Sequence, residues 1–180
     1  MMAGIFVGGK GLRMNGQAKG LLRVNGISIV EHWCTLLRPF AVDVVLVGVR
    51  PEYASLGLRI LPDRVANCGP MGGLAALLEA AQGAVLALGG DMPYVTGAML
   101  EALIQEPSDA LVVAPKRDGQ WEPLFSRVRA NAKDFVVDCL KRRELSLQKL
   151  FDSLHAHPLN LNHDEEICLH DWDSPEDIQQ

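Results

Sequence analysis

The chain has 180 residues, of which 48% are hydrophobic and 22% are charged, and its formal net charge is −5. This size and composition predict one globular domain over residues 1–180 with a sizeable core. The negative charge argues against broad non-specific binding to nucleic acid, which depends on an excess of Lys and Arg.

The cysteines and the N-terminus indicate the compartment. The four cysteines are widely spaced and form no C-x-x-C pair, so a zinc or iron–sulfur site has little support and free thiols are expected. The apolar run over residues 1–7 lacks a basic stretch before it and is too short for a signal peptide or a membrane span. We therefore expect a cytoplasmic protein that does not bind a membrane, with its first apolar run in a buried strand.

Short apolar runs alternate with helical patterns along the chain. The expected strands are 5–7, 43–48, 58–61, 84–88, 109–114, 120–125 and 167–169. The expected helices are 27–37, 51–56, 75–81, 97–105, 128–142 and 146–154. This alternation predicts βαβ crossovers and a largely parallel sheet covered by helices on both faces.

The first expected strand runs into a glycine-rich loop with basic residues. Val7 is followed by Gly8-Gly9, and Arg13 and Lys19 come soon after. Glycines let backbone N–H groups approach a polyphosphate closely, and Arg and Lys neutralise its charge. The spacing fits neither the Rossmann fingerprint nor the Walker A loop. A solvated turn with surface Lys and Arg is the alternative that this stretch leaves open.

Three further features also follow expected strands. Asp91 could hold Mg²⁺, or it could cap the turn before Pro93. Asp63 could accept a hydrogen bond from a ribose hydroxyl, or form a turn. Residues 69–73 could open a helix whose N-terminal amides face an anion or a nucleobase, or they could pack the helix tightly on the sheet. Because ligands in such folds bind at the carboxyl ends of the strands, we expect the first glycine loop and Gly89-Gly90-Asp91 to converge.

Several motifs, in this order, resemble those of the molybdenum cofactor guanylyltransferases, the MobA family. They are Val7-Gly8-Gly9, Arg13-Met14, Lys19-Gly20-Leu21, Pro62-Asp63, Gly69 to Gly73, Gly90 to Pro93, Glu122-Pro123-Leu124 and residues 171–177. The resemblance extends from about residue 4 to residue 178. It implies a Rossmann-like three-layer α/β/α nucleotidyltransferase fold with a mostly parallel mixed sheet. It also implies transfer of GMP from GTP to molybdopterin, with Mg²⁺ as cofactor, to give molybdopterin guanine dinucleotide and pyrophosphate.

The resemblance also implies roles for individual residues. In the N-terminal, nucleotide-binding half, Gly8, Gly9, Arg13 and Lys19 would bind the triphosphate, and Asp91 would hold Mg²⁺. Arg13, Lys19 and Asp91 would be the catalytic residues. The nucleoside would contact Val7, Asp63, Gly69 and Gly72. In the C-terminal, acceptor-binding half, Pro123, Asp171 and Asp173 would line the pterin side.

Asp171 and Asp173 stand where the family has asparagines, and an ionised Asp accepts hydrogen bonds without donating any. This difference leaves alternatives open. One is cytidylyl transfer, or another nucleotidyl transfer on the same fold. Another is a non-catalytic protein that binds GTP or the finished cofactor and delivers it. Other molybdenum-cofactor proteins and molybdoenzymes are expected partners, and the chain is expected to be a monomer or a weak oligomer.

Overall fold

The computed structural model describes residues 1–8, 18–40 and 42–172. Its strands are β1 (Met2–Phe6), β2 (Arg23–Val24), β3 (Ile27–Ser28), β4 (Asp43–Val47), β5 (Arg59–Leu61), β6 (Val85–Gly89), β7 (Val112–Ala114), β8 (Lys116–Arg117), β9 (Gln120–Trp121), β10 (Phe125–Val128) and β11 (His157–Pro158). Its α-helices are α1 (Ile29–Leu37), α2 (Gly69–Ala80), α3 (Gly97–Gln105), α4 (Lys133–Arg142), α5 (Leu147–Ser153) and α6 (His163–Cys168). Short 3₁₀ helices are η2 (Lys19–Leu21), η3 (Arg38–Phe40), η4 (Pro51–Leu56) and η5 (Ala130–Ala132).

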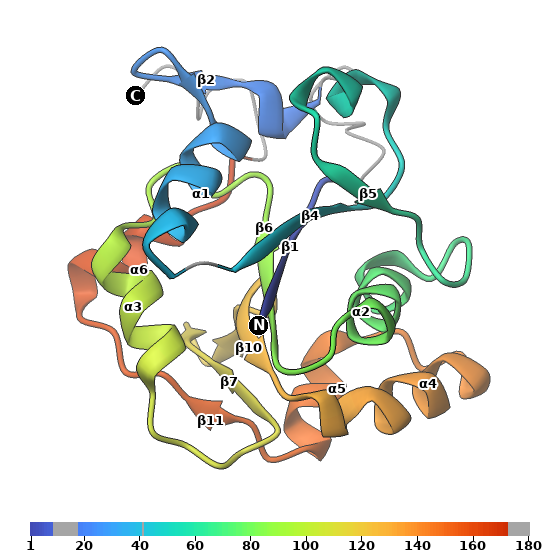
Figure 1. The fold of residues 1–180 in the computed structure, drawn as a ribbon. Helices are drawn as coiled ribbons and strands as arrows, with labels where there is room; N and C mark the ends of the chain where they lie inside the picture. Colours follow the sequence, from blue (N-terminus) through green and yellow to red (C-terminus); the bar gives the residue numbers. More distant parts are fainter. Residues whose placement is uncertain (9–17, 41, 173–180) are drawn as a thin grey trace.

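The main sheet has seven strands in the order β11-β7-β10-β6-β1-β4-β5. Its neighbouring strands pair in parallel except where β10 runs antiparallel to β6 and to β7. Helices cover both faces of the sheet (Figure 1). The predicted α/β/α layers with a mostly parallel mixed sheet are therefore confirmed.

The strands alternate their side chains between two hydrophobic cores. Val45 and Val47 of β4 pack into the core beneath α2, α4 and α5, and Leu46 between them packs into the core beneath α1 and α3. Strands buried on both faces read as continuous apolar runs, which is why β1, β4 and β6 were recognisable in the sequence. Helix α2 lies close against the sheet, because a Cβ at Gly73 would come within 2.6 Å of the Val47 side chain.

Two hairpins that the sequence analysis missed leave the main sheet. Asn25-Gly26 joins β2 to β3, with φ values of 52° and 86°. Asp118-Gly119 joins β8 to β9, with φ values of 49° and 78°. Positive φ at both central residues is the type I′ turn that Asn-Gly and Asp-Gly favour. The turn residues were the available signal.

Several predicted boundaries were wrong. The helix expected over 128–142 begins at Lys133, because β10 occupies residues 125–128. The strand expected over 120–125 is divided between β9 and β10. The strand expected over 167–169 overlaps the end of α6 instead, because Asn162 and Glu165 form a reciprocal capping box that starts a helix there. By contrast, the helix whose alanine-rich part was expected over 75–81 begins at Gly69, within the residues 69–73 that were expected to open it.

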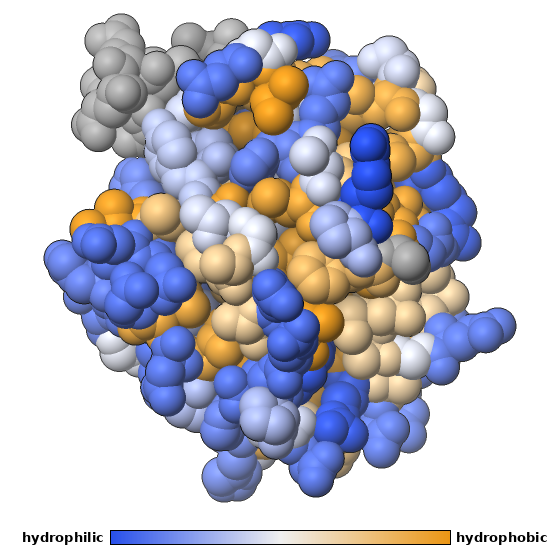
Figure 2. Space-filling model, turned by 60° about the vertical axis from the view of Figure 1, so that its left-hand side comes forward, coloured by the Kyte–Doolittle hydropathy of each residue, from blue (hydrophilic) through white to orange (hydrophobic). Residues whose placement is uncertain are grey.

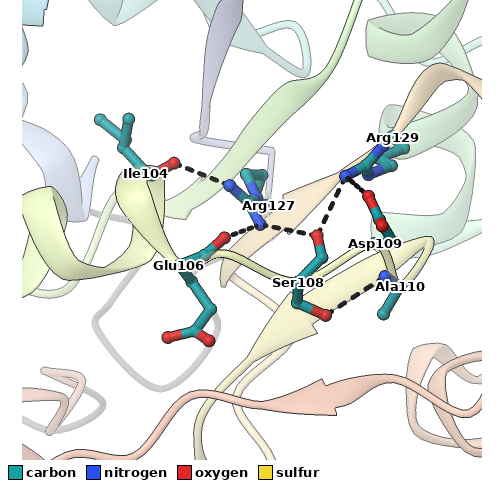
Figure 3. A network of polar contacts seen from close by, with 7 residues as sticks. All are labelled: Ile104, Glu106, Ser108, Asp109, Ala110, Arg127 and Arg129. Carbon is teal, nitrogen blue, oxygen red and sulfur yellow. Dashed lines mark hydrogen bonds and ion pairs between the residues drawn. The ribbon is translucent and has the colours of Figure 1, made fainter.

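A polar network fixes the edge of the sheet where β10 ends (Figure 3). Arg127 of β10 donates to the carbonyls of Ile104 and Glu106, both at 2.7 Å, at the end of α3. Arg129 donates to the Ser108 carbonyl at 3.0 Å and pairs with Asp109 at 2.9 Å. Arg127 thus satisfies carbonyls that the end of a helix leaves without intrahelical partners, and Arg129 bonds to the loop that follows. They serve the fold, at the edge opposite the strand ends that carry the candidate site.

Hydrophobic side chains are interspersed with hydrophilic ones on the face of the molecule that Figure 2 shows. The described residues include seven exposed large hydrophobic ones, which are Met1, Ile27, Val49, Val65, Tyr94, Phe135 and Ile167. Scattered exposure of this kind is ordinary for a folded protein. None of the helices in the described ranges has the length and apolar character needed to cross a bilayer.

Trp33 of α1 gives a test of how the central strand end is held. Its buried indole Nε1 donates to the Gly89 carbonyl at 2.8 Å, at the end of β6. Trp33→Phe leaves that buried carbonyl without this donor, which should cost about 1–3 kcal/mol of unfolding free energy in addition to the lost packing. Trp121→Phe is the matched control, since the Trp121 indole donates at 2.8 Å to Asp152, which is exposed and stays hydrated. Urea denaturation should show the larger loss for Trp33→Phe, and equal losses would contradict this role.

Candidate active site

The parallel strands bring the predicted groups to one edge of the sheet. Phe6 at the end of β1 is in register with Val47 of β4 and Gly89 of β6, so the residues after these strands emerge side by side. The Gly90 N–H donates to the Phe6 carbonyl at 3.0 Å. The predicted convergence of the first strand end with the Gly89-Gly90-Asp91 turn is therefore observed.

Glycines make this convergence sterically possible. A Cβ at Gly90 would lie 2.8 Å from the Phe6 carbonyl oxygen, and a Cβ at Gly48 would lie 2.5 Å from the Cα of Gly8. Gly48 also has φ of +99°, which other residues rarely adopt. The sequence analysis singled out Gly8 but missed Gly48, which appeared only as the end of a strand.

Lys19 and Asp91 meet at this edge. The Lys19 Nζ lies 3.3 Å from the Asp91 Oδ2, and the side chains are 19% and 27% exposed. Lys19 begins η2, whose next residue, Gly20, donates its backbone N–H to the Tyr53 hydroxyl at 3.0 Å. Burial raises the pKa of Tyr53, so its hydroxyl stays neutral and able to accept this bond. Tyr53 is a positioning residue for Lys19 that no motif in the sequence indicated.

Asp63 and the start of α2 form a second part of the edge. A Cβ at Gly72 would lie 2.9 Å from the Val65 carbonyl oxygen and 3.6 Å from the Asp63 Cβ, so the absence of a side chain lets this loop lie on the first turn of α2. The Arg64 N–H bonds to the Gly72 carbonyl at 3.3 Å. Although Asp63 is largely exposed, partial desolvation of its carboxyl raises its pKa.

Helix α2 presents its amino terminus at this loop. Within the described chain, its N-cap residue Cys68 makes no side-chain cap hydrogen bond, and the first turn holds no acidic residue. The amides of the first turn and the positive end of the helix dipole therefore suit a polar or anionic ligand group. Gly69 has φ of +55° and opens the helix at this point. Residues 69–73 do open a helix, and Gly73 packs closely on the sheet, as the packing alternative expected; the binding role of these amides stays a prediction.

The C-terminal half reaches the same edge from the other side. Pro123 lies just before β10, beside β6, and Leu124 accepts the Gly89 N–H at 2.7 Å. The Trp172 N–H donates to the Asp91 carbonyl at 2.9 Å, so Asp171 is brought close to Asp91. The Trp172 ring also packs edge-on against Tyr94, with 5.9 Å between the ring centroids.

Glu122 adds a carboxylate that the sequence analysis recorded only as part of a motif. Its Oε1 lies 2.8 Å from the Arg117 Nε, and its side chain is 15% exposed. Burial raises the pKa of Glu122 against the opposing effect of Arg117, and the negative charges of Asp171 and Asp91 raise it further. Three carboxylates, those of Asp91, Glu122 and Asp171, therefore sit within electrostatic reach of one another.

Most predicted site residues lie at this edge. They are Val7, Gly8, Lys19, Asp63, Gly69, Gly72, Asp91, Pro123 and Asp171. Gly9, Arg13 and Asp173 were also predicted, and they lie outside the described residues. Their roles remain predictions.

An α/β/α sheet with a lysine, an aspartate and close-packed glycines at its carboxyl edge is the arrangement expected of a nucleotide-handling enzyme. The family model described as "MobA-like NTP transferase domain" matches residues 3–157. The chain therefore belongs to the MobA-like NTP transferase family, and it is an enzyme of the nucleotidyltransferase class.

Individual relatives agree with this membership. The chain is 31% identical over 167 residues to a molybdenum cofactor guanylyltransferase of Pseudomonas paraeruginosa, covering 87% of this chain and 82% of that protein. The crystal structure of molybdopterin-guanine dinucleotide biosynthesis protein A from Archaeoglobus fulgidus superposes with a TM-score of 0.81 at 22% identity, covering 99% of this chain and 95% of that one. The 2-C-methyl-D-erythritol 4-phosphate cytidylyltransferase of Thermus thermophilus superposes with a TM-score of 0.69 at 16% identity, covering 98% and 94%. These two structures show a shared fold.

Gly90 allows a test of the close approach that holds Asp91. Gly90→Ala should lower the unfolding free energy by about 1–3 kcal/mol, because the new Cβ clashes with backbone that cannot move aside easily. Gly83→Ala is the matched control, since a Cβ there meets nothing within 4 Å. Denaturant unfolding should show the control within about 0.5 kcal/mol of the unsubstituted protein. Equal stability of the two variants would contradict the steric argument.

Proposed function

We propose that the chain transfers GMP from GTP to molybdopterin, giving molybdopterin guanine dinucleotide and pyrophosphate. The observation that carries the proposal is the Lys19–Asp91 pair at the carboxyl edge of the sheet. In this pair, Lys19 would bind phosphate and Asp91 would bind the metal ion, and the chain is a member of the MobA-like family. The relative from Pseudomonas paraeruginosa, which matches most of the chain, is named as a guanylyltransferase of this cofactor.

The nucleotide would bind between the first strand end and α2. Lys19 and the Gly8 backbone amide bind the triphosphate, together with Gly9 and Arg13. Positive charge there stabilises the charge that develops on the α-phosphorus and on departing pyrophosphate. Val7, Gly69 and Gly72 border the guanine, and Asp63 accepts a hydrogen bond from the nucleoside. The close approach of Gly72 to the Asp63 loop supports placing these groups around one ligand.

The residues at Asp91 fit a bound Mg²⁺. The Asp91 carboxylate is partly exposed beside Lys19, at the end of a strand. A carboxylate in this position suits Mg²⁺, which is commonly bound through one or two carboxylates and the phosphates of the substrate. When bound, Mg²⁺ would supply charge neutralisation of the triphosphate.

The acceptor would bind on the C-terminal side of the same edge, bordered by Pro123, Asp171 and Asp173. The contact between Trp172 and the Asp91 backbone supports this placement. We propose one domain over residues 1–180, with the nucleotide on its N-terminal half and molybdopterin on its C-terminal half. A cytoplasmic location, a monomeric or weakly oligomeric state and contacts with other molybdenum-cofactor proteins and molybdoenzymes remain predictions.

The proposal is tested by incubating the protein with Mg²⁺, molybdopterin and either GTP or CTP, and measuring the dinucleotide and pyrophosphate formed. We expect turnover with GTP and a much lower kcat/KM with CTP. Preference for CTP would replace the guanylyl assignment with a cytidylyl one. Tight GTP binding without any turnover would contradict the reaction itself.

Lys19→Ala should weaken GTP binding about 10- to 100-fold, because a charge-assisted contact contributes roughly 1.5–3 kcal/mol. Calorimetric titration with GTP measures this directly. Arg23→Ala is the control, since exposed Arg23 donates to the Gly26 carbonyl within its own hairpin and should leave GTP affinity unchanged. An unchanged affinity in Lys19→Ala would contradict the triphosphate assignment.

Asp91→Asn should lower the Mg²⁺-dependent rate by about 100-fold or more, because the substitution removes the carboxylate charge while keeping the shape of the side chain. The rate of pyrophosphate release at saturating substrates measures it, and thermal unfolding checks the fold. The matched control is Asp43→Asn, at the start of β4, where exposed Asp43 pairs with Arg59 at 3.0 Å. Near-normal turnover in Asp91→Asn would remove Asp91 from the metal role.

A further inference from the structure

The β8–β9 hairpin presents two cations at the carboxyl edge, and they have different partners. The Lys116 ammonium lies over the Trp121 ring, 4.2 Å from its centroid. The Arg117 Nε pairs with the Glu122 Oε1 at 2.8 Å, and the Arg117 side chain is 30% exposed. Lys116 therefore turns toward its own hairpin, and Arg117 turns toward the loop that precedes β10.

The hairpin is held rigidly. Its type I′ turn fixes the backbone between the two strands. Gln148 of α5 accepts from the Trp121 N–H at 2.9 Å and donates to the Trp121 carbonyl at 2.7 Å. The Trp121 indole also bonds to Asp152 at 2.8 Å. Arg117 therefore extends from a hairpin that is hydrogen-bonded to α5, which favours a defined position for its side chain.

Glu122 pairs with the Nε atom of the Arg117 guanidinium. A guanidinium carries five N–H donors in one plane, and Nε supplies only one of them. Over the residues that the structure describes, Glu122 is the one ion-pair partner of Arg117. The two terminal amino groups, Nη1 and Nη2, are the pair that grips phosphate oxygens bidentately.

The charges around Glu122 explain why a cation is needed there. The Gly89 N–H bonds to the Leu124 carbonyl at 2.7 Å, and the Trp172 N–H bonds to the Asp91 carbonyl at 2.9 Å. These two bonds bring the segments that carry Glu122 and Asp171 to the turn that carries Asp91, so the three carboxylates lie in one region. A phosphate monoester entering this region would meet net repulsion. On the nucleotide side, Lys19 already pairs with Asp91. Through its pair with Glu122, Arg117 places a cation beside this region from the C-terminal half.

We propose that Arg117 binds the terminal phosphate of the acceptor through its two terminal amino groups, with Glu122 as the positioning residue that orients the guanidinium. The inference rests on the proposed function, which makes molybdopterin the acceptor. Arg117 holds non-attacking oxygens of that phosphate. Another of its oxygens forms the new bond to the α-phosphorus of GTP as the bond to pyrophosphate breaks.

The first test is Arg117→Gln, assayed with GTP, Mg²⁺ and molybdopterin. We expect the KM for molybdopterin to rise about 10- to 100-fold, while the GTP dissociation constant stays within about twofold. Arg117→Lys keeps the positive charge but removes the planar guanidinium that can bind two phosphate oxygens at once, so its KM for molybdopterin should be intermediate. Lys116→Gln is the matched control on the same strand and should leave the KM for molybdopterin unchanged. An unchanged KM in Arg117→Gln would overturn the proposal.

A double variant separates phosphate binding from simple neutralisation of Glu122. If Arg117 only offsets the Glu122 charge, Arg117→Gln combined with Glu122→Gln should return the KM for molybdopterin to the unsubstituted value. If Arg117 binds the phosphate, the double variant should keep the raised KM of the single variant. Restoration in the double variant would therefore overturn the proposal.

Direct binding keeps this inference distinct from the proposed reaction. Molybdopterin is titrated into the protein loaded with a non-hydrolysable GTP analogue, without turnover. Loss of binding in Arg117→Gln supports the inference even if guanylyl transfer fails for the unsubstituted protein, which would overturn only the proposed function. Equal binding by both proteins would overturn the inference alone. If the unsubstituted protein does not bind molybdopterin, both are overturned.

Discussion

The hydrogen bond from the Gly90 N–H to the Phe6 carbonyl joins the ends of the two central strands, and the candidate site depends on it. It fixes the position from which Asp91 extends toward Lys19. The Trp33 indole donates a hydrogen bond to the Gly89 carbonyl, and the Trp172 N–H donates one to the Asp91 carbonyl. The backbone around this aspartate is therefore held from α1, from β1 and from the C-terminal segment. A carboxylate that is to bind a metal needs support of this kind, because small displacements weaken both binding and chemistry.

The described charges divide the edge into two sides. The side proposed to bind the nucleotide carries Lys19 and the amino terminus of α2. The opposite side gathers Glu122 and Asp171 near Asp91, with Arg117 paired to Glu122. A phosphate that binds on this acidic side needs a cation beside it, which is the basis of the role proposed for Arg117.

The strand ends that carry the candidate site could be predicted from the sequence much better than the contacts between distant segments. Doubly buried strands such as β1 and β6 carry a strong apolar signal, and glycines and Asp91 follow them directly. Tyr53 and Glu122 gave no comparable signal, because their contacts join elements far apart in the chain. The Asp118-Gly119 turn could have revealed the hairpin that carries Arg117. The late strand expected at Ile167 failed because a local capping box outweighed a short apolar run.

The central claim is that the chain transfers a guanylyl group, with the α-phosphorus of GTP as the point of attack. The most direct measurement follows radiolabel from α-labelled and γ-labelled GTP in parallel reactions with molybdopterin and Mg²⁺. The account predicts that the α-label appears in the dinucleotide and the γ-label appears only in pyrophosphate. Transfer of the γ-label to the acceptor, or no transfer of the α-label by the folded protein, would contradict the account.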